Sequence, residues 1–343
     1  MIFASDNWAG ASDAVMAALT RHNSGFAPAY GNDPLTEAVT QRFCDLFERE
    51  VAVFFVATGT AANSLALSAY AKPGGTIFCH AESHVAVDEC GAPEFFSGGA
   101  KLVALAGPHG KFSPKSLSAA LARHDSGDVH HGQPVAVTIS QATEAGTIYS
   151  PEEIRAIKEV AASRGLPLHM DGARFANALA HLDISPAEMT WKAGVDVLSF
   201  GATKNGCWCA EAVVFFNPQD AAQFGYLRMR GGQNLSKNRF AAAQFEGYLA
   251  DGHWLDLARH ANAMASRLAD GIHVSESGRL AIAPQANEVF AVFSSEKIAA
   301  LRAAGAVMHE WPSDGLEAGE SMVRLVASFR TSREDVDAFL ALL

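Results

Sequence analysis

The fold class is indicated most clearly by residues 150–174, which read SPEEIRAIKEVAASRGLPLHMDGAR. Ser150 and Glu153 are spaced as a capping box, with proline at the first helical position between them. Apolar residues then recur at helical spacing up to Gly165, which ends the predicted helix. Residues 166–170 form a short apolar run that is typical of a buried strand. The segment is therefore expected to be a helix followed directly by a strand.

The same alternation extends through the chain up to about residue 240. Short apolar runs that predict strands lie at 51–56, 76–79, 135–139 and 195–200, and helical patterns lie at 36–49 and 61–71. Strands that alternate with helices form a mainly parallel sheet with right-handed crossovers. We therefore expect an α/β fold with a mainly parallel central sheet, in a large domain over residues 31–240.

The pattern changes after about residue 240. A long helical pattern over 240–267 is followed by a strand at 289–293, a helix near 296–304, a strand near 322–328 and a final helix. Residues 241–343 are therefore expected to form a smaller C-terminal α+β domain. Residues 1–30 carry few regular signals, and we expect them to form an N-terminal segment that contributes to the functional site.

Composition excludes several classes of protein. Of the 343 residues, 49% are hydrophobic and 18% are charged, which is typical of a globular chain with a sizeable core. Asp and Glu number 37 against 26 Lys and Arg, so the net charge is −11 and no nucleic-acid partner is expected. The five cysteines are irregularly spaced, which fits a reducing compartment better than a disulfide framework.

Targeting, dinucleotide and metal motifs are not evident. The chain begins MIFASDNWAG, without the basic region of a signal peptide, and the charge-free stretch 51–71 is polar at its centre. We expect a cytoplasmic protein with no membrane partner. The sequence contains no G-x-G, which argues against a dinucleotide fingerprint. His80 and His84 have no evident third ligand, so no metal is expected.

Four sequence elements could bind a ligand or carry out chemistry. Two of them are a glycine turn and an aspartate, and each lies at the C-terminal end of a predicted strand. In an open α/β sheet, ligands bind at the edge formed by the C-terminal ends of the strands. Thr58-Gly59-Thr60 precedes a helix, whose free N–H groups and dipole suit a phosphate, although such turns are also common without one. Asp171 ends a buried strand, where a carboxylate needs a partner, and the alternative is an aspartate that caps the next helix.

The other two elements are a lysine and a histidine. Lys204 follows the strand at 195–200 within a run of small residues, where partial desolvation would free its amine to attack a carbonyl. The alternative is a lysine at the rim of the protein. His84 lies just past the strand at 76–79 and could stack on a flat cofactor, or else be a buried or helix-capping histidine.

Together the four elements match the requirements of pyridoxal 5′-phosphate. Its aldehyde needs a lysine amine, its pyridine nitrogen a carboxylate, its phosphate a helix N-terminus, and its ring something to sit against. Asp171 and Lys204 are 33 residues apart, which is one β–α–β step. We therefore expect the two side chains on neighbouring strands at the same edge of the sheet.

The chain resembles a low-specificity L-threonine aldolase, a fold-type I pyridoxal-phosphate enzyme, over nearly its whole length. The motifs that carry the resemblance are Ser5-Asp6-Asn7, Tyr30-Gly31-Asn32-Asp33-Pro34, Thr58-Gly59-Thr60-Ala61-Ala62-Asn63, His84, His169-Met170-Asp171-Gly172-Ala173-Arg174, Thr203-Lys204 and Val323-Arg324-Leu325-Val326. The H-x-D-G-A-R block is the most specific of these. The resemblance implies cleavage of L-threonine, L-allo-threonine and related β-hydroxy-α-amino acids to glycine and an aldehyde.

The resemblance also implies roles for residues that would hold the cofactor. Lys204 would bind it covalently, and Asp171 would pair with the pyridine nitrogen. Gly59 and Thr60 would hold the phosphate, and His84 would stack on the ring and help the proton-transfer step.

Substrate contacts follow from the same resemblance. Ser5, Arg174 and Arg324 would hold the substrate carboxylate, a task that suits the bidentate fork of arginine. Arg174 would also lie among the cofactor-binding residues, and Tyr30 and Glu144 among those that contact the substrate.

Sites in this family form at a subunit interface, which implies a homodimer or a homotetramer. A basic residue of the partner subunit would contact the phosphate, and we rank Arg228 ahead of Arg230 and Lys237 for that role.

One departure from the family pattern concerns proton transfer. Where many relatives read T-H-N-G, with the histidine near the substrate β-hydroxyl, this chain reads Thr143-Glu144-Ala145-Gly146. Glu144 therefore leaves the proton-transfer assignment and the threo/erythro preference open, and it could favour an aryl substituent. The alternatives are a phenylserine aldolase, another fold-type I lyase or aminotransferase, or a catalytically idle pyridoxal-phosphate-binding protein.

Overall fold

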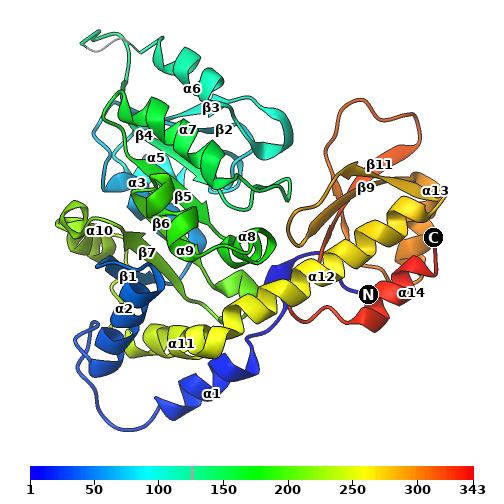
Figure 1. Ribbon diagram of the computed structural model, residues 1–343, viewed down its shortest axis with the longest axis horizontal. Helices are drawn as coiled ribbons and strands as arrows, with labels where there is room; N and C mark the ends of the chain where they lie inside the picture. Colours follow the sequence, from blue (N-terminus) through cyan, green and yellow to red (C-terminus); the bar gives the residue numbers. More distant parts are fainter. Residues whose placement is uncertain (125–126) are drawn as a thin grey trace.

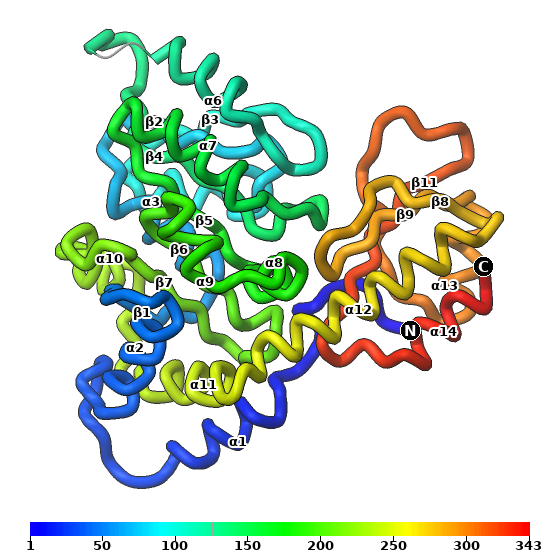
Figure 2. The backbone as a smooth tube through the Cα atoms, in the orientation of Figure 1, coloured from blue at the N-terminus to red at the C-terminus, as the bar shows by residue number. Residues whose placement is uncertain are grey.

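The computed structural model describes residues 1–124 and 127–343. Within these residues the chain folds around two sheets, and the long helix α12 (His253–Val274) runs from one to the other (Figure 1). Both ends of the chain lie beside the second, smaller sheet (Figure 2).

The central sheet of the described residues has seven strands, in the order β1-β7-β6-β5-β4-β2-β3. They are β1 (Ala52–Val56), β2 (Gly75–His80), β3 (Lys101–Leu105), β4 (Gln133–Ser140), β5 (Leu168–Gly172), β6 (Val197–Gly201) and β7 (Glu211–Phe215). Strands β6, β5, β4, β2 and β3 pair in parallel, whereas β7 runs antiparallel to β6 and β1. The expectation of a mainly parallel α/β sheet is confirmed.

Helices pack on both faces of this sheet. They are α2 (Pro34–Leu46), α3 (Gly59–Ser68), α4 (His84–Val87), α5 (Ala92–Phe96), α6 (Pro114–Leu121), α7 (Pro151–Ala162), α8 (Phe175–Leu182), α9 (Pro186–Met189), α10 (Phe224–Arg230) and α11 (Arg239–Leu249). Val213 and Phe215 of β7 pack with α3 and α10, while Val214 packs with the core that contains α2, α7, α8 and α11. Burial on both faces explains why the strands read as continuous apolar runs.

The capping box at the start of α7 forms as predicted. The Ser150 hydroxyl accepts the N–H of Glu153 at 3.2 Å, and the Glu153 carboxylate accepts the N–H of Ser150 at 2.7 Å. The helix ends at Ala162, and β5 begins at Leu168.

An aromatic cluster supports the end of β6. The ring of Phe200 lies 5.2 Å from that of Phe43, 5.5 Å from Phe175 and 5.5 Å from Trp254, measured between centroids. Aromatic pairs at such distances add to the stabilisation that comes from burial. The cluster therefore holds the strand that leads into the segment containing Lys204.

The predicted long helix over 240–267 is wrong. The chain instead forms α11 and α12, which are separated at Asp251 and Gly252. These two residues adopt φ angles of 49° and 75°, in the left-handed region that glycine tolerates and aspartate enters at modest cost. The buried residues also change helical phase at this point, from Ala241, Phe245 and Tyr248 in α11 to Trp254 and Ala258 in α12.

The second sheet is antiparallel, in the order β10-β11-β9-β8. Its strands are β8 (Gly278–Ile282), β9 (Glu288–Ser294), β10 (His309–Trp311) and β11 (Glu320–Val326), and it is joined by α13 (Ser295–Ala303) and α14 (Arg333–Leu340). Its core includes the second half of α12, whereas Trp254 and Ala258 in the first half of α12 belong to the core of the large sheet.

The N-terminal residues pack with this second sheet. Phe3 is fully buried in its core, and the Phe3 N–H donates to the Val307 carbonyl at 2.9 Å. The chain then passes to the edge of the large sheet, where α1 (Asp13–Arg21) packs on α11. We propose two domains: a large one over 31–240 that continues through α11, which belongs to the core of the large sheet, and a smaller one in the rest of 241–343. Helix α12 connects them, and 1–30 joins both to the site between them.

None of the helices in the described parts of the chain is long and apolar enough to cross a lipid bilayer.

Truncation of the aromatic cluster is expected to destabilise the protein strongly. Phe200→Ala should lower the free energy of unfolding by about 3–5 kcal/mol, because the change leaves a cavity among several rings. Urea unfolding followed by tryptophan fluorescence measures the effect. Phe95→Ala is the control, since that side chain is 80% exposed. Equal unfolding midpoints for the two variants would contradict the prediction.

Candidate active site

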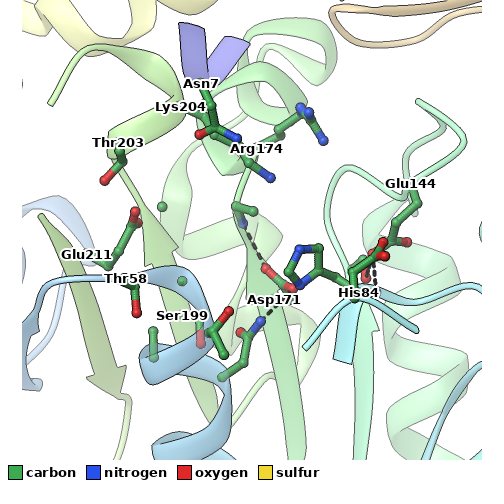
Figure 3. A pocket seen from close by; sticks show the side chains of 18 of the residues that line it. Asn7, Thr58, His84, Glu144, Asp171, Arg174, Ser199, Thr203, Lys204 and Glu211 are labelled. Carbon is green, nitrogen blue, oxygen red and sulfur yellow. Dashed lines mark hydrogen bonds between the residues drawn. The ribbon is translucent and has the colours of Figure 1, made fainter. Parts of the chain in front are cut away.

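A cavity of about 530 Å³ opens at the C-terminal edge of the parallel strands, beside the second sheet (Figure 3). Nine of the eleven residues that the sequence points to line it: Ser5, Gly59, Thr60, His84, Glu144, Asp171, Arg174, Lys204 and Arg324. Tyr30 and Arg228 do not line it. The structure therefore brings together residues that are spread over more than 300 positions of the chain.

Asp171 and Lys204 come from neighbouring strands. The parallel register of β5 and β6 pairs Asp171 with Ser199, and Lys204 follows in the short turn after β6. Asp171 is buried: its Oδ1 accepts the N–H of Ala173 at 3.0 Å and its Oδ2 accepts the amide of Asn63 at 2.8 Å. The aspartate thus serves the backbone after β5 and also faces the cavity.

The turn that carries Lys204 is held firmly from behind. The amide of the next residue, Asn205, donates to the Tyr248 hydroxyl at 2.7 Å and to the Trp254 carbonyl at 2.8 Å. Gly206 has φ 121°, and a Cβ there would lie 2.8 Å from a methyl of Leu257, so only glycine fits. These contacts fix the backbone and leave the Lys204 side chain half-buried in the cavity lining.

The first turn of α3 provides a site for an anion. Thr58 caps this helix by accepting the N–H of Ala61 at 3.2 Å. The helix itself offers no acceptor to the N–H groups of Gly59 and Thr60, and there is no acidic residue in the first turn. The positive end of the helix dipole therefore faces the cavity, as phosphate binding requires.

His84 lies in a hydrogen-bonded line of polar side chains. Its Nδ1 is 2.8 Å from Oε1 of Glu89, and the same oxygen accepts the amide of Asn63 at 2.8 Å. Asn63 also donates to Asp171. The hydrogen bond to Glu89 raises the pKa of His84.

Glu144 is placed next to His84. Its Oε1 accepts the backbone N–H of His84 at 2.8 Å and the hydroxyl of Ser140 at 2.9 Å, while its Oε2 is buried without a hydrogen-bond partner among the described residues. Burial, together with the charge of Asp171, raises the pKa of Glu144 to about 7. The carboxyl group therefore changes protonation near neutral pH.

The two arginines of the cavity differ in their partners. Arg174 is clamped by Asp6, from Nε to Oδ2 at 2.8 Å and from Nη2 to Oδ1 at 3.1 Å, and its Nη1 lies 3.2 Å from Glu288. Although burial opposes it, the charge of Arg174 holds the pKa of Asp6 below its usual value. Arg174 thus faces two carboxylates before any ligand binds.

Arg324 keeps more of its hydrogen-bonding capacity free. Its guanidinium stacks on Trp311 at 4.2 Å from the ring centroid and is 3.8 Å from Glu288, too far for a hydrogen bond. Its Nε has no partner among the described residues. An incoming carboxylate would therefore find a fixed and unsatisfied donor at Arg324.

Tyr30 and Arg228 lie outside the cavity of this chain. Tyr30 is exposed, and its N–H donates to the Ser236 carbonyl at 3.0 Å. Arg228 is buried in α10, where it donates to the Gln233 carbonyl at 3.1 Å and to Asn238 Oδ1 at 2.8 Å. Their suggested roles stay predictions.

Several acids in or next to the cavity escape sequence reasoning. Glu89 and Glu288 are acids whose local sequence gives no signal, because only tertiary contacts place them beside His84 and Arg174. Glu211 begins β7, accepts the N–H of Ala202 at 2.9 Å and lines the cavity, and burial raises its pKa to about 7. A single acid at the start of an apolar strand is the one local hint of such a site.

Known proteins resemble this chain closely. It matches the beta-eliminating lyase family over residues 3–295. It is 45% identical to a low specificity L-threonine aldolase of Pseudomonas aeruginosa over 97% of this chain and 94% of the relative, and 46% identical to one of a Pseudomonas species over 88% and 87%. A solved threonine aldolase structure from Leishmania major superposes with a TM-score of 0.93 at 28% identity, covering 99% of this chain and 98% of that chain.

Among the described residues, one antiparallel strand, β7, lies within an otherwise parallel sheet, and a lysine and an aspartate lie at the C-terminal edge of that sheet. Together with the similar proteins, this arrangement identifies the class of protein as the fold-type I pyridoxal-phosphate enzymes. The expected fold class is confirmed. Within that class the chain belongs to the beta-eliminating lyase family, and in it to the low-specificity L-threonine aldolases. The family resemblance seen in the sequence is therefore confirmed.

The raised pKa of Glu144 predicts a pH-dependent stability difference. Its pKa of about 7 lies above the ordinary value of 4.5, so the contribution of Glu144 to stability falls between pH 4.5 and 7 as the buried group is forced to ionise. Glu144→Gln keeps an acceptor oxygen and carries no charge. The variant should therefore gain roughly 3 kcal/mol relative to wild type as the pH rises from 4.5 to 8.

Urea unfolding of both proteins at pH 5 and pH 8 measures this change. Glu82→Gln is the control, because it makes the same substitution at an exposed position. A wild-type-to-variant difference that is the same at both pH values would refute the assignment.

Proposed function

We propose that the protein is a pyridoxal-phosphate-dependent carbon–carbon lyase that cleaves L-threonine, L-allo-threonine and related β-hydroxy-α-amino acids to glycine and an aldehyde. The observation that carries the proposal is the convergence of Lys204, Asp171 and the N-terminus of α3 on one cavity. The relatives named low specificity L-threonine aldolase support it.

The donor set fits pyridoxal phosphate. Lys204 supplies the amine for its aldehyde, Asp171 a carboxylate for its ring nitrogen, and the backbone N–H groups of Gly59 and Thr60 hydrogen-bond donors for its phosphate oxygens. His84, which lines the same cavity, would sit against the ring. When bound, the cofactor supplies an electron sink that stabilises negative charge on the substrate Cα.

The substrate carboxylate is proposed to bind at Arg324, with Ser5 and Arg174 beside it. Arg324 has an unsatisfied Nε and a guanidinium fixed by stacking on Trp311. Arg174, already clamped by Asp6, contributes charge and holds the N-terminal segment, which includes Ser5, in place. This anchoring orients the substrate so that its β-substituent points toward His84 and Glu144.

Two groups are placed to take the β-hydroxyl proton. Nδ1 of His84 is engaged by Glu89, which leaves Nε2 for the cavity, and Oε2 of Glu144 is unpartnered. Removal of this proton turns the hydroxyl-bearing carbon into an aldehyde as the Cα–Cβ bond breaks. The electron pair of that bond stays with Cα, which then takes up a proton to give glycine.

Cleavage of aryl β-hydroxy amino acids such as phenylserine is a second candidate. A further cavity of about 580 Å³ shares Asp88, Glu144 and Trp311 with the site and has a mixed lining, in which Ile282 and Phe290 are among the apolar side chains. An aryl group would bury more apolar surface there than the methyl group of threonine. Comparison of kcat/KM for threonine and phenylserine separates the two.

The assembly and the location remain proposals. We propose a homodimer or homotetramer in which Tyr30 and a basic residue near Gly231, with Arg228 ranked first, serve the site of a neighbouring subunit. The exposed aromatic residues Trp8, Tyr30 and Tyr226 support an interface. Five free cysteines support a cytoplasmic location.

Loss of Lys204 should abolish turnover. Lys204→Ala is expected to lower kcat for L-threonine cleavage by about 10³-fold or more, because no amine then reacts with the cofactor. Borohydride should fix the cofactor to the wild-type chain and not to the variant, as seen by mass spectrometry. Lys192→Ala, an exposed lysine, is the control. If wild type yields neither glycine nor acetaldehyde from L-threonine, the activity on that substrate is rejected.

Arg324→Lys should weaken substrate binding more than turnover. A lysine offers a point charge in place of the planar fork, so KM for L-threonine should rise about 10-fold or more while kcat changes less. Arg302→Lys, a half-exposed arginine, is the matched control. An unchanged KM would place the carboxylate elsewhere.

A further inference from the structure

One buried acid next to the cavity has no role in the proposal so far. The side chain of Glu89 has no exposed surface, and its Oε1 contacts both His84 Nδ1 and Asn63 Nδ2 at 2.8 Å. Burying a carboxylate is costly unless hydrogen bonds or charges compensate. We therefore ask what the hydrogen bonds of Glu89 do for the two side chains that it contacts, His84 and Asn63.

The hydrogens of this cluster can be assigned from the contacts. Asn63 uses its Nδ2 twice, toward Glu89 and toward Asp171 Oδ2, so its two amide hydrogens point at two carboxyl groups. Oε1 of Glu89 is thus already an acceptor. An ionised Glu89 can only accept, so we assign the hydrogen between Glu89 and His84 to Nδ1 of the imidazole, which leaves Nε2 as the atom available to the cavity.

We propose that Glu89 is a positioning residue of the aldolase: it fixes the ring of His84 with the hydrogen on Nδ1, and through Asn63 it links that ring to Asp171. This inference rests on the proposed function, because His84 and Asp171 matter through the cofactor and substrate they face. Glu89 itself touches neither, since it is buried behind His84.

Several charged groups around His84 affect its pKa, and Glu89 is one of them. Among the described residues, Glu89 and Asp171 favour the protonated ring, whereas Lys204 disfavours it, and Glu144 accepts the backbone N–H of His84. Burial also disfavours the protonated ring, and the hydrogen bond to Glu89 outweighs this, so the pKa of His84 is raised. Burial raises the pKa of Glu89, against the hydrogen bonds from His84 and Asn63.

Glu89→Gln separates positioning from simple packing. The glutamine Oε1 can still accept from both His84 and Asn63, and its amide replaces Oε2, which has no hydrogen-bond partner among the described residues. The shape and the two hydrogen bonds are kept, the charge is lost, and the amide adds two hydrogens at the position of Oε2. Glu82→Gln is the matched control, because it removes an exposed carboxylate two residues from His84.

The first measurement is the NMR titration of His84 in histidine-labelled holoenzyme, assigned with His84→Asn. Glu89→Gln should lower the pKa of His84 by about one unit or more, as expected for loss of an adjacent opposite charge, and Glu82→Gln should leave it in place. An unchanged pKa in Glu89→Gln would overturn the proposal.

The second measurement needs no variant at Glu89. Above its pKa, the neutral ring of wild-type His84 should keep its hydrogen on Nδ1, which the ¹⁵N shifts of the two ring nitrogens report. A hydrogen on Nε2 instead would overturn the proposal even if the glutamine variant failed to fold.

The pH dependence of kcat/KM tests whether the pKa of His84 governs the reaction. If His84 takes the β-hydroxyl proton, the acid limb of kcat/KM should move to lower pH in Glu89→Gln by the same amount as the NMR pKa. If the acid limb of kcat/KM stays in place while the NMR pKa of His84 moves, the proposed role of Glu89 in catalysis is overturned. Absence of any turnover by wild type would reject the proposed function, and the NMR results would still decide whether Glu89 sets the state of His84.

Discussion

The site depends on the parallel register of β5 and β6. Asp171 stands opposite Ser199, so the strand that ends in the aspartate and the strand that leads to Lys204 finish side by side. A slip of one residue would turn Asp171 to the other face of the sheet. Both strands are buried along their whole length, and their apolar residues oppose such a slip. The packing of the sheet therefore determines which two side chains meet in the cavity.

Polar contacts beneath the cavity reinforce that register. His169 lies two residues before Asp171 on the same face of β5, and its ring bridges the two neighbouring strands, with Nδ1 2.8 Å from Thr138 Oγ1 and Nε2 2.9 Å from Ser199 Oγ. Burial lowers the pKa of His169 to about 4, so the ring stays neutral and offers one donor and one acceptor. The histidine of the H-x-D-G-A-R block thus ties β4, β5 and β6 together one layer below the aspartate.

Local patterns could predict the repeated helix–strand units and the residues that end strands, because both depend on neighbours in the sequence. They gave the α7–β5 unit, Asp171, Lys204 and the turn at Gly59. They missed β7, whose antiparallel insertion between β1 and β6 is a property of the whole sheet, and the break at Asp251, where a left-handed backbone conformation interrupts the helix. They also missed acids such as Glu89, since nothing within a few residues shows that a carboxylate will be buried against a histidine.

The buried acids also bear on how the cavity handles protons. Burial raises the pKa of Glu144 and of Glu211 to about 7, so each exchanges a proton near neutral pH. Glu144 lies on the His84 side, and Glu211 accepts a backbone N–H next to the turn that carries Lys204. Cleavage of a β-hydroxy amino acid takes a proton from oxygen and returns one to carbon. Groups that titrate near the working pH on both sides of the cavity suit that exchange better than carboxylates that stay ionised. The apolar packing that stabilises the sheet thereby also tunes the acids at its edge.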